Sequence, residues 1–98
     1  MSTRHEFEPD AAFFEGHFEG RPILPAMAQL EYVRRALAEA APDRAVVAVL
    51  AARMRAPLLP GERLTVSLGA LGEQGAARVR FQVLRADEVV TQGVLRVE

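Results

Sequence analysis

The sequence contains no cysteine, which excludes disulfides, thiolate metal ligands and a cysteine nucleophile. It also contains no lysine, because all twelve basic residues are arginine, and this excludes a lysine Schiff base. No run of 18 apolar residues is present, so we expect no membrane span. The first residues include no apolar stretch that could act as a signal peptide, and we therefore expect a cytoplasmic location.

Several binding functions are excluded in the same way. There is no glycine-rich phosphate loop and no histidine pair at metal-ligand spacing, so no metal is expected. The formal net charge of −1 is too small for a general polyanion binder, so we expect no nucleic-acid partner. What is present is globular: 98 residues, 50% hydrophobic and 26% charged, which predicts one domain over residues 1–98. A domain of this size buries only about 60–65% of its unfolded surface, which favours a core shared with a second chain.

The first half of the chain predicts one strand and one helix. Residues 3–8 are typical of a short strand, and residues 9–25 form a connection rich in proline, glycine and phenylalanine. A helix is predicted from Ala26 to Ala41, because Pro25 suits its start and Pro42 ends it. The apolar residues of this segment recur at spacings of three and four: Leu30, Val33, Leu37 and Ala40 or Ala41.

After residue 44 the apolar pattern changes to a period of two. It predicts four strands separated by turns, at residues 45–56, 64–70, 78–83 and 89–97. One early helix followed by consecutive strands is typical of the α+β class, and we expect the four strands to form an antiparallel meander.

Two histidines are available for proton transfer. His5 lies in the first predicted strand with no chemical neighbour, and we interpret it as a solvated residue. His17 lies in the long connection, and Glu31 follows it fourteen positions later inside the helix, as a natural acid–base partner. The alternative is a structural histidine, with Glu31 in an ordinary surface ion pair with Arg34 or Arg35.

The start of the helix is a third candidate. The N–H groups of a first helical turn have no partner inside the helix and carry partial positive charge. The N–H of Ala26 can therefore polarise a carbonyl oxygen. Every helix has such an end, so this feature has little specificity on its own.

A resemblance to a known family lies in the segment Phe13-Phe-Glu-Gly-His17-Phe-Glu-Gly-Arg-Pro22-Ile-Leu-Pro25-Ala-Met-Ala-Gln-Leu-Glu31. It resembles the pattern F-F-x-G-H-F-P-G-x-P-x-x-P-G, followed by an acidic residue fourteen places after the histidine. A second segment, Met54-Arg-Ala-Pro57-Leu-Leu-Pro60-Gly61-Glu62, is similar to aromatic-x-x-P-x-x-P-G-D. The chain thus resembles, over nearly its whole length, the 3-hydroxyacyl-[acyl-carrier-protein] dehydratases of the hot dog fold. Among these it looks most like the compact dehydratases of polyene-type pigment and secondary lipid pathways.

The resemblance implies a fold and a mechanism. One long helix would be wrapped by an antiparallel β-sheet, and two chains would form a homodimer with one continuous sheet. The active site would lie at the dimer interface, with His17 from one chain and Glu31 from the other. His17 would remove the proton α to the thioester carbonyl, the N–H of Ala26 would stabilise the enolate-like oxygen, and Glu31 would assist loss of the β-hydroxyl as water. For a carboxyl at a mostly apolar interface we expect a raised pKa.

Further implications concern the substrate. No cofactor is expected, because the acyl chain arrives on the phosphopantetheine of an acyl carrier protein. Apolar residues would line the acyl tunnel, namely Phe13, Phe14, Phe18 and Met27, and three arginines are expected to dock the acidic carrier, namely Arg21, Arg53 and Arg55. Two alternatives stay open: an acyl thioesterase with Glu31 as base or nucleophile, and a non-catalytic acyl-binding or partner subunit of a hot dog heterodimer. The second is favoured by Ala26, which stands where the family has glycine.

Overall fold

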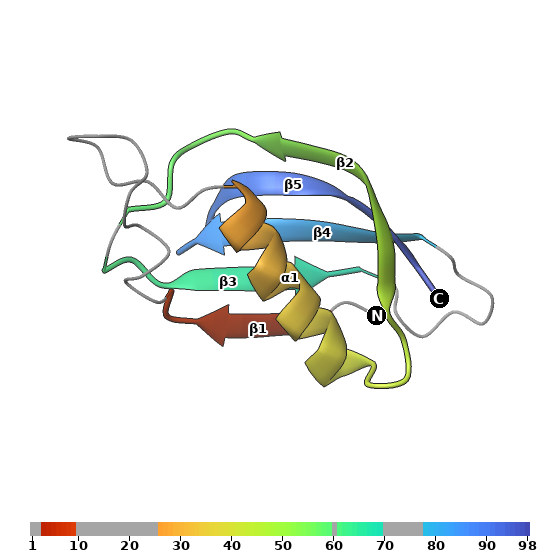
Figure 1. The fold of residues 1–98 in the computed structure, drawn as a ribbon. Coiled ribbons are helices and arrows are strands. Elements are labelled where there is room, and N and C mark those ends of the chain that lie inside the picture. Colours follow the sequence, from red (N-terminus) through yellow and green to blue (C-terminus); the bar gives the residue numbers. More distant parts are fainter. Residues whose placement is uncertain (1–2, 10–25, 60, 70–77) are drawn as a thin grey trace.

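A computed structural model describes residues 3–9, 26–59, 61–69 and 78–98 of the chain. In it, a five-stranded antiparallel sheet carries one helix across one face (Figure 1). The elements in chain order are β1 (Thr3–Phe7), α1 (Ala26–Ala40), β2 (Val46–Met54), β3 (Leu64–Leu68), β4 (Arg78–Arg85) and β5 (Glu88–Val97). The predicted helix and strands are all present, with ends that differ from the prediction by a few residues, and the α+β class is confirmed.

The strand order corrects one prediction. The sheet runs β1-β3-β4-β5-β2, so β3, β4 and β5 form the expected meander, but β2 does not pair with β3. Residues 3–7 of β1 pair with residues 64–68 and so occupy the free edge of β3. The chain after β2 therefore crosses the sheet, and β2 pairs with β5 at the opposite edge. The prediction of a four-strand meander is wrong at β2, because a strand early in the chain has taken its place.

The core lies between α1 and the sheet. Alternate residues of β3 and β4 point toward the helix and are buried, as the period of two predicted: Leu64, Val66, Leu68, Val79, Phe81 and Val83. The helix contributes its apolar stripe to the same core: Tyr32, Val33, Ala36 and Leu37. The side chains between these positions on the two strands are polar or charged and point away from the helix. One face of the sheet therefore packs on α1, and the other, here called the outer face, is polar.

Strand β2 is poorly covered. Its nine residues are largely apolar, yet its side chains are mostly exposed, with Val49 at 43% and Leu50 at 44%. It is also an edge strand, so one side of its backbone has no neighbouring strand among the residues that the structure describes. A long apolar edge of this kind is a template for pairing with another chain.

His5 is not the solvated residue that the sequence suggested. Its position in β1 pairs with Val66, a residue that faces the helix, and its side chain is only 17% exposed. Its Nδ1 lies 2.9 Å from Oε2 of Glu39 in α1, so His5 links the first strand to the helix. Within the described segments, no helix is long and apolar enough to cross a membrane.

Candidate active site

The first turn of α1 is held against the sheet by a buried polar contact. The helix begins at Ala26, as predicted, so the N–H of Ala26 belongs to the first turn, where the helix leaves N–H groups without internal partners. Three residues later, Gln29 is fully buried, and its Oε1 accepts a hydrogen bond from the hydroxyl of Thr91 in β5. This contact anchors the start of the helix, because both partners are buried where an unmade hydrogen bond is costly.

Glu31 lies on the second turn of α1 and is paired within the helix. Its carboxylate accepts two hydrogen bonds from Arg34, from Nη2 at 2.7 Å and from Nε at 3.0 Å. A third comes from Nε of Arg35 at 3.2 Å. Its side chain is 33% exposed. The surface ion pair that the sequence offered as the alternative for Glu31 is therefore present.

These contacts set the charge of Glu31. The hydrogen bonds from Arg34 lower the pKa of its carboxyl to about 2, aided by Arg35 and by the positive charge of both guanidinium groups, while burial acts in the opposite direction. The expectation of a raised pKa is therefore wrong for the single chain, because two arginines outweigh the desolvation. At neutral pH this carboxyl is ionised, so it accepts hydrogen bonds rather than donates a proton.

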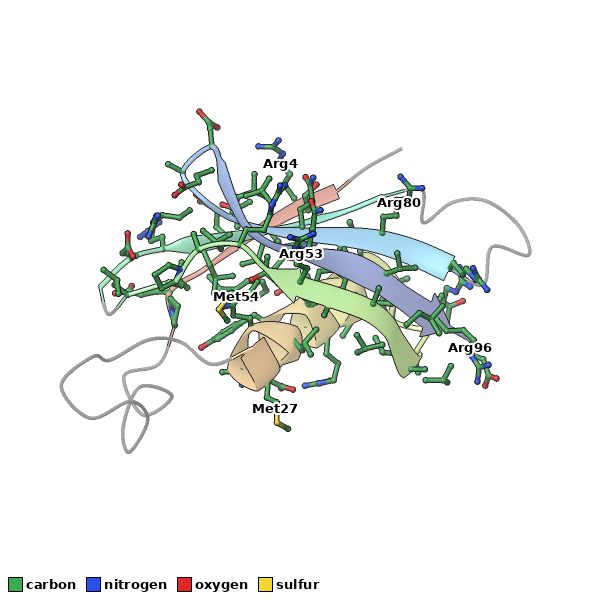
Figure 2. The ribbon with its side chains drawn as sticks, turned by 90° about the horizontal axis from the view of Figure 1, so that it is seen from above. Arg4, Met27, Arg53, Met54, Arg80 and Arg96 are labelled. Atoms are coloured by element: carbon green, nitrogen blue, oxygen red, sulfur yellow. The ribbon has the colours of Figure 1, made fainter. Side chains whose placement is uncertain are left out.

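Only some of the other predicted site residues lie in the part of the chain that the structure describes. The candidates His17, Phe13, Phe14, Phe18 and Arg21 lie outside the described residues. Met27, expected to line the tunnel, is 84% exposed in the single chain and lies beside the helix start (Figure 2). Arg53 lies on the outer face of the sheet, opposite the face that carries Glu31, and Arg55 follows the end of β2. Arg53, one of the three predicted docking arginines, therefore does not lie beside Glu31.

The second family-like segment forms a braced turn. Leu58 is fully buried in the core, while Glu62 accepts a hydrogen bond from the N–H of Leu59 at 2.8 Å. Arg85 of β4 donates to the carbonyl oxygen of Pro57 at 2.9 Å and to Oε1 of Glu62 at 3.2 Å. The acidic residue at the end of this motif thus supports the backbone between β2 and β3. In the part of the chain that the structure describes, no three histidine, aspartate or glutamate side chains come together to hold a metal ion.

Sequence reasoning missed two sets of residues. The buried pair of Gln29 and Thr91 was not predicted, because a glutamine in a helix or a threonine in a strand gives no sign in the sequence that it is buried. Arg80 and Gln82, which lie on the outer face of β4, were not among the predicted site residues. The alternation itself was the available signal, since it predicts that they share one face.

Comparison with known proteins assigns the chain to a family. The profile of the ApeI-like family, described as ApeI dehydratase, matches residues 1–94. The chain belongs to the ApeI-like dehydratase family. Among named relatives, the 3-hydroxyacyl-[acyl-carrier-protein] dehydratase FabZ of Myxococcus xanthus is 35% identical, over 65% of this chain and 48% of that protein. The FabZ of Geobacter metallireducens is 32% identical, over 86% of this chain and 63% of its own length. This ApeI-like chain spans about half the length of the first of these relatives.

Solved structures show the fold. The dehydratase heterocomplex ApeI:P from Xenorhabdus doucetiae superposes with a TM-score of 0.75 and 23% identity, over 98% of this chain and 84% of that one. The (R)-hydratase of A. caviae gives a TM-score of 0.78 at 12% identity, over 100% and 93% of the two chains. The ApeI-like chain thus has the hot dog fold, as the resemblance in the sequence implied.

Proposed function

We propose that this ApeI-like chain dehydrates a 3-hydroxyacyl thioester, carried on an acyl carrier protein, to the 2-enoyl thioester. The observation that carries the proposal is the first part of α1. There a helix start at Ala26 and an ionised carboxylate at Glu31 stand in one helix, and Glu31 follows His17 by fourteen residues. Membership of a dehydratase family supports the same reaction.

The chemistry follows from what each group can do. The proton on the carbon α to the thioester becomes acidic only when negative charge on the carbonyl oxygen is stabilised, which the N–H of Ala26 supplies. His17 takes that proton as general base. The bond from the β-carbon to its hydroxyl then breaks, and the hydroxyl leaves as water after it receives a proton from the imidazolium of His17. Because Glu31 is ionised, its role is to accept a hydrogen bond from the leaving hydroxyl or from a water that bridges to it.

A homodimer completes the proposed site. The exposed edge of β2 supports it, because pairing of two β2 strands would satisfy their free backbone groups and cover Val49 and Leu50. Residues from both chains would then enclose Met27 and the acyl tunnel with Phe13, Phe14 and Phe18. In this proposal the enzyme needs no cofactor of its own, since the substrate brings the phosphopantetheine, and it acts in the cytoplasm.

The test is a complementation experiment. Turnover by the wild type, by His17→Ala and by Glu31→Ala is measured from the absorbance of the enoyl thioester. We expect the rate of each variant to be about 10²–10⁴-fold lower than that of the wild type. If each site takes His17 from one chain and Glu31 from the other, a mixed dimer of the two variants contains one intact site of two. An equal mixture, unfolded and refolded together, should then recover about a quarter of the wild-type activity. No recovery would contradict the shared site, and no turnover by the wild type would contradict dehydration.

The ionised Glu31 also supports a second candidate, a thioesterase, because a carboxylate is the form that acts as a general base or nucleophile. Release of free thiol from the acyl thioester, without formation of the enoyl product, would identify this activity. Tight acyl binding without either product would identify the non-catalytic partner subunit. That outcome would make this chain one subunit of a heterocomplex, the kind of assembly that ApeI:P forms.

A further inference from the structure

One row of polar side chains crosses the whole outer face of the sheet. The register places its members side by side on all five strands, because Arg53 pairs with Gln92, Gln92 with Gln82, Gln82 with Ser67, and Ser67 with Arg4. This set is here called the outer row. It has an arginine at each end and three uncharged hydrogen-bonding side chains between them. Figure 2 shows Arg4, Arg53 and Arg80 on the side of the sheet away from the helix.

A hollow of about 560 Å³ lies over this part of the sheet. Polar side chains from four strands line it, namely Arg53, Arg80, Ser67, Gln82 and Gln92, and no acidic residue does so in the described part of the chain. Arg53 and Arg80 are exposed, and neither forms an ion pair with any described residue. By contrast, Arg34, Arg35 and Arg85 each pair with a glutamate. Positive charge in the hollow is therefore uncompensated within the described residues.

The adjacent part of the outer face is different. A second hollow there is lined by Arg4, Arg63 and Arg85 together with three acidic residues, namely Glu6, Glu62 and Asp87. Its charges compensate one another, since Arg85 already pairs with Glu62. Of these two hollows on the outer face, the one at Arg53 and Arg80 therefore carries the uncompensated positive charge.

We propose that the hollow at Arg53 and Arg80, with the uncharged members of the outer row that line it, is the docking surface for the acidic acyl carrier protein, an inference that rests on the proposed function. The unpaired Arg53 and Arg80 attract carboxylates, and the two glutamines and the serine that line the same hollow supply hydrogen-bond donors that hold an acidic segment in place. A second copy of this chain does not fit the same face, because a symmetric contact would bring like charges together. The row has no aromatic side chain on which a nucleic-acid base could stack.

The position of the outer row relative to α1 agrees with this role. Arg53 is the residue before Met54, which ends β2, and Met54 pairs with Thr91. The hydroxyl of Thr91 in turn binds Gln29 in the first turn of the helix. Figure 1 shows that β2 ends and α1 begins at the same end of the sheet. The Arg53 end of the outer row therefore lies near the end of the sheet at which the helix begins, so the arm of a carrier seated there can pass around to the helix start.

Charge reversal tests the docking surface. Arg53→Glu and Arg80→Glu are compared with the matched control Arg63→Glu, which makes the same charge change in the compensated hollow. Each is assayed with a 3-hydroxyacyl group on a holo acyl carrier protein and with the same acid as a pantetheine thioester. We expect kcat/KM for the carrier substrate to fall about tenfold or more in the first two variants, through a rise in KM, because lost charge steering acts on encounter. Turnover of the pantetheine thioester by Arg53→Glu and Arg80→Glu should stay at the wild-type level. Turnover of both substrates by the control Arg63→Glu should also stay at the wild-type level.

Equal kcat/KM for the carrier substrate in all four proteins would overturn the docking surface while leaving dehydration intact. If the wild type turns over neither substrate, calorimetric titration with the holo carrier protein decides the question independently of catalysis. Binding to the wild type and to Arg63→Glu, lost in Arg53→Glu and Arg80→Glu, supports the surface. Absence of binding to the wild type overturns it, as does loss of binding in the control to the same extent. Vesicles with anionic lipid serve as a second probe, and wild-type binding to vesicles but not to the carrier would also overturn the proposal.

Discussion

Removal of the guanidinium of Arg34 tests whether Glu31 works as an ionised carboxylate. Arg34 donates two of the three hydrogen bonds that Glu31 accepts, including the one of 2.7 Å, whereas Arg35 donates one of 3.2 Å. In Arg34→Ala the pKa of Glu31 should therefore rise from about 2 toward its ordinary value of 4.5, and it should rise less in Arg35→Ala. Both arginines are about half exposed, at 56% and 45%, so solvent screens the pairs and the effect on overall stability is small.

The same substitution has a larger expected effect on the fraction of Glu31 that is protonated at pH 7, and hence on the rate if Glu31 were the proton donor. With a pKa of about 2, roughly one Glu31 in 10⁵ is protonated at pH 7, against roughly one in 300 at the ordinary value of 4.5. If Glu31 donated the proton to the leaving hydroxyl, Arg34→Ala would raise the population of the active form by up to about 300-fold, and the rate at pH 7 would rise with it. If Glu31 acts as an ionised acceptor, as proposed, the rate does not rise.

The assay combines a titration with kinetics. Carbon-detected NMR follows the carboxyl carbon of Glu31 from pH 7 to pH 2 in the wild type and in both variants, and kcat/KM is measured over the same series at pH 5 to 9. Because the folded-state pKa of Glu31 is lowered, its ion pairs contribute stability above pH 4.5, and this contribution is lost as pH falls from 4.5 toward 2. A wild-type pKa at or above 4.5, or a faster Arg34→Ala enzyme at pH 7, would refute the reasoning.

Two further predictions concern stability. An added Cβ in Gly93→Ala would lie 2.1 Å from the carbonyl oxygen of Ala51, so we expect the free energy of unfolding in urea to fall by about 1–3 kcal/mol. Gly69→Ala, whose added Cβ would lie 3.7 Å from the carbonyl oxygen of Arg80, is the control, and equal effects would contradict the close approach. Thr91→Val removes the hydroxyl that donates to the buried Gln29, at a cost of about 1–3 kcal/mol. A variant as stable as the wild type in the same urea titration would show that this contact does not anchor the helix.

Much of the local structure could be predicted from the sequence, because it depends on neighbours along the chain. The spacing of Leu30, Val33 and Leu37 and the flanking prolines predicted the helix, which runs from Ala26 to Ala40. The period of two in residues 64–68 predicted which side chains of that strand are buried. These patterns hold because side chains repeat with a fixed period along a helix or a strand. The spacing of the apolar residues therefore indicates which face of the element each residue occupies. The motif that contains His17 and Glu31 is equally local, and the sequence alone therefore indicated the family.

The remaining features were decided by contacts between residues far apart in the chain. Strand β2 pairs with β5 because β1, which comes first in the chain, already occupies the edge of β3. The same distant pairing aligns Arg53 with Gln92 and Gln82 into the outer row, although nothing in their spacing along the chain links them. His5 meets Glu39 only because β1 packs beside the end of α1. The charge of Glu31 lies between the two cases: its partners are three and four residues away, but their balance against burial depends on how the helix sits on the sheet. Periodicity describes one element at a time, whereas strand order and burial are properties of the packed whole.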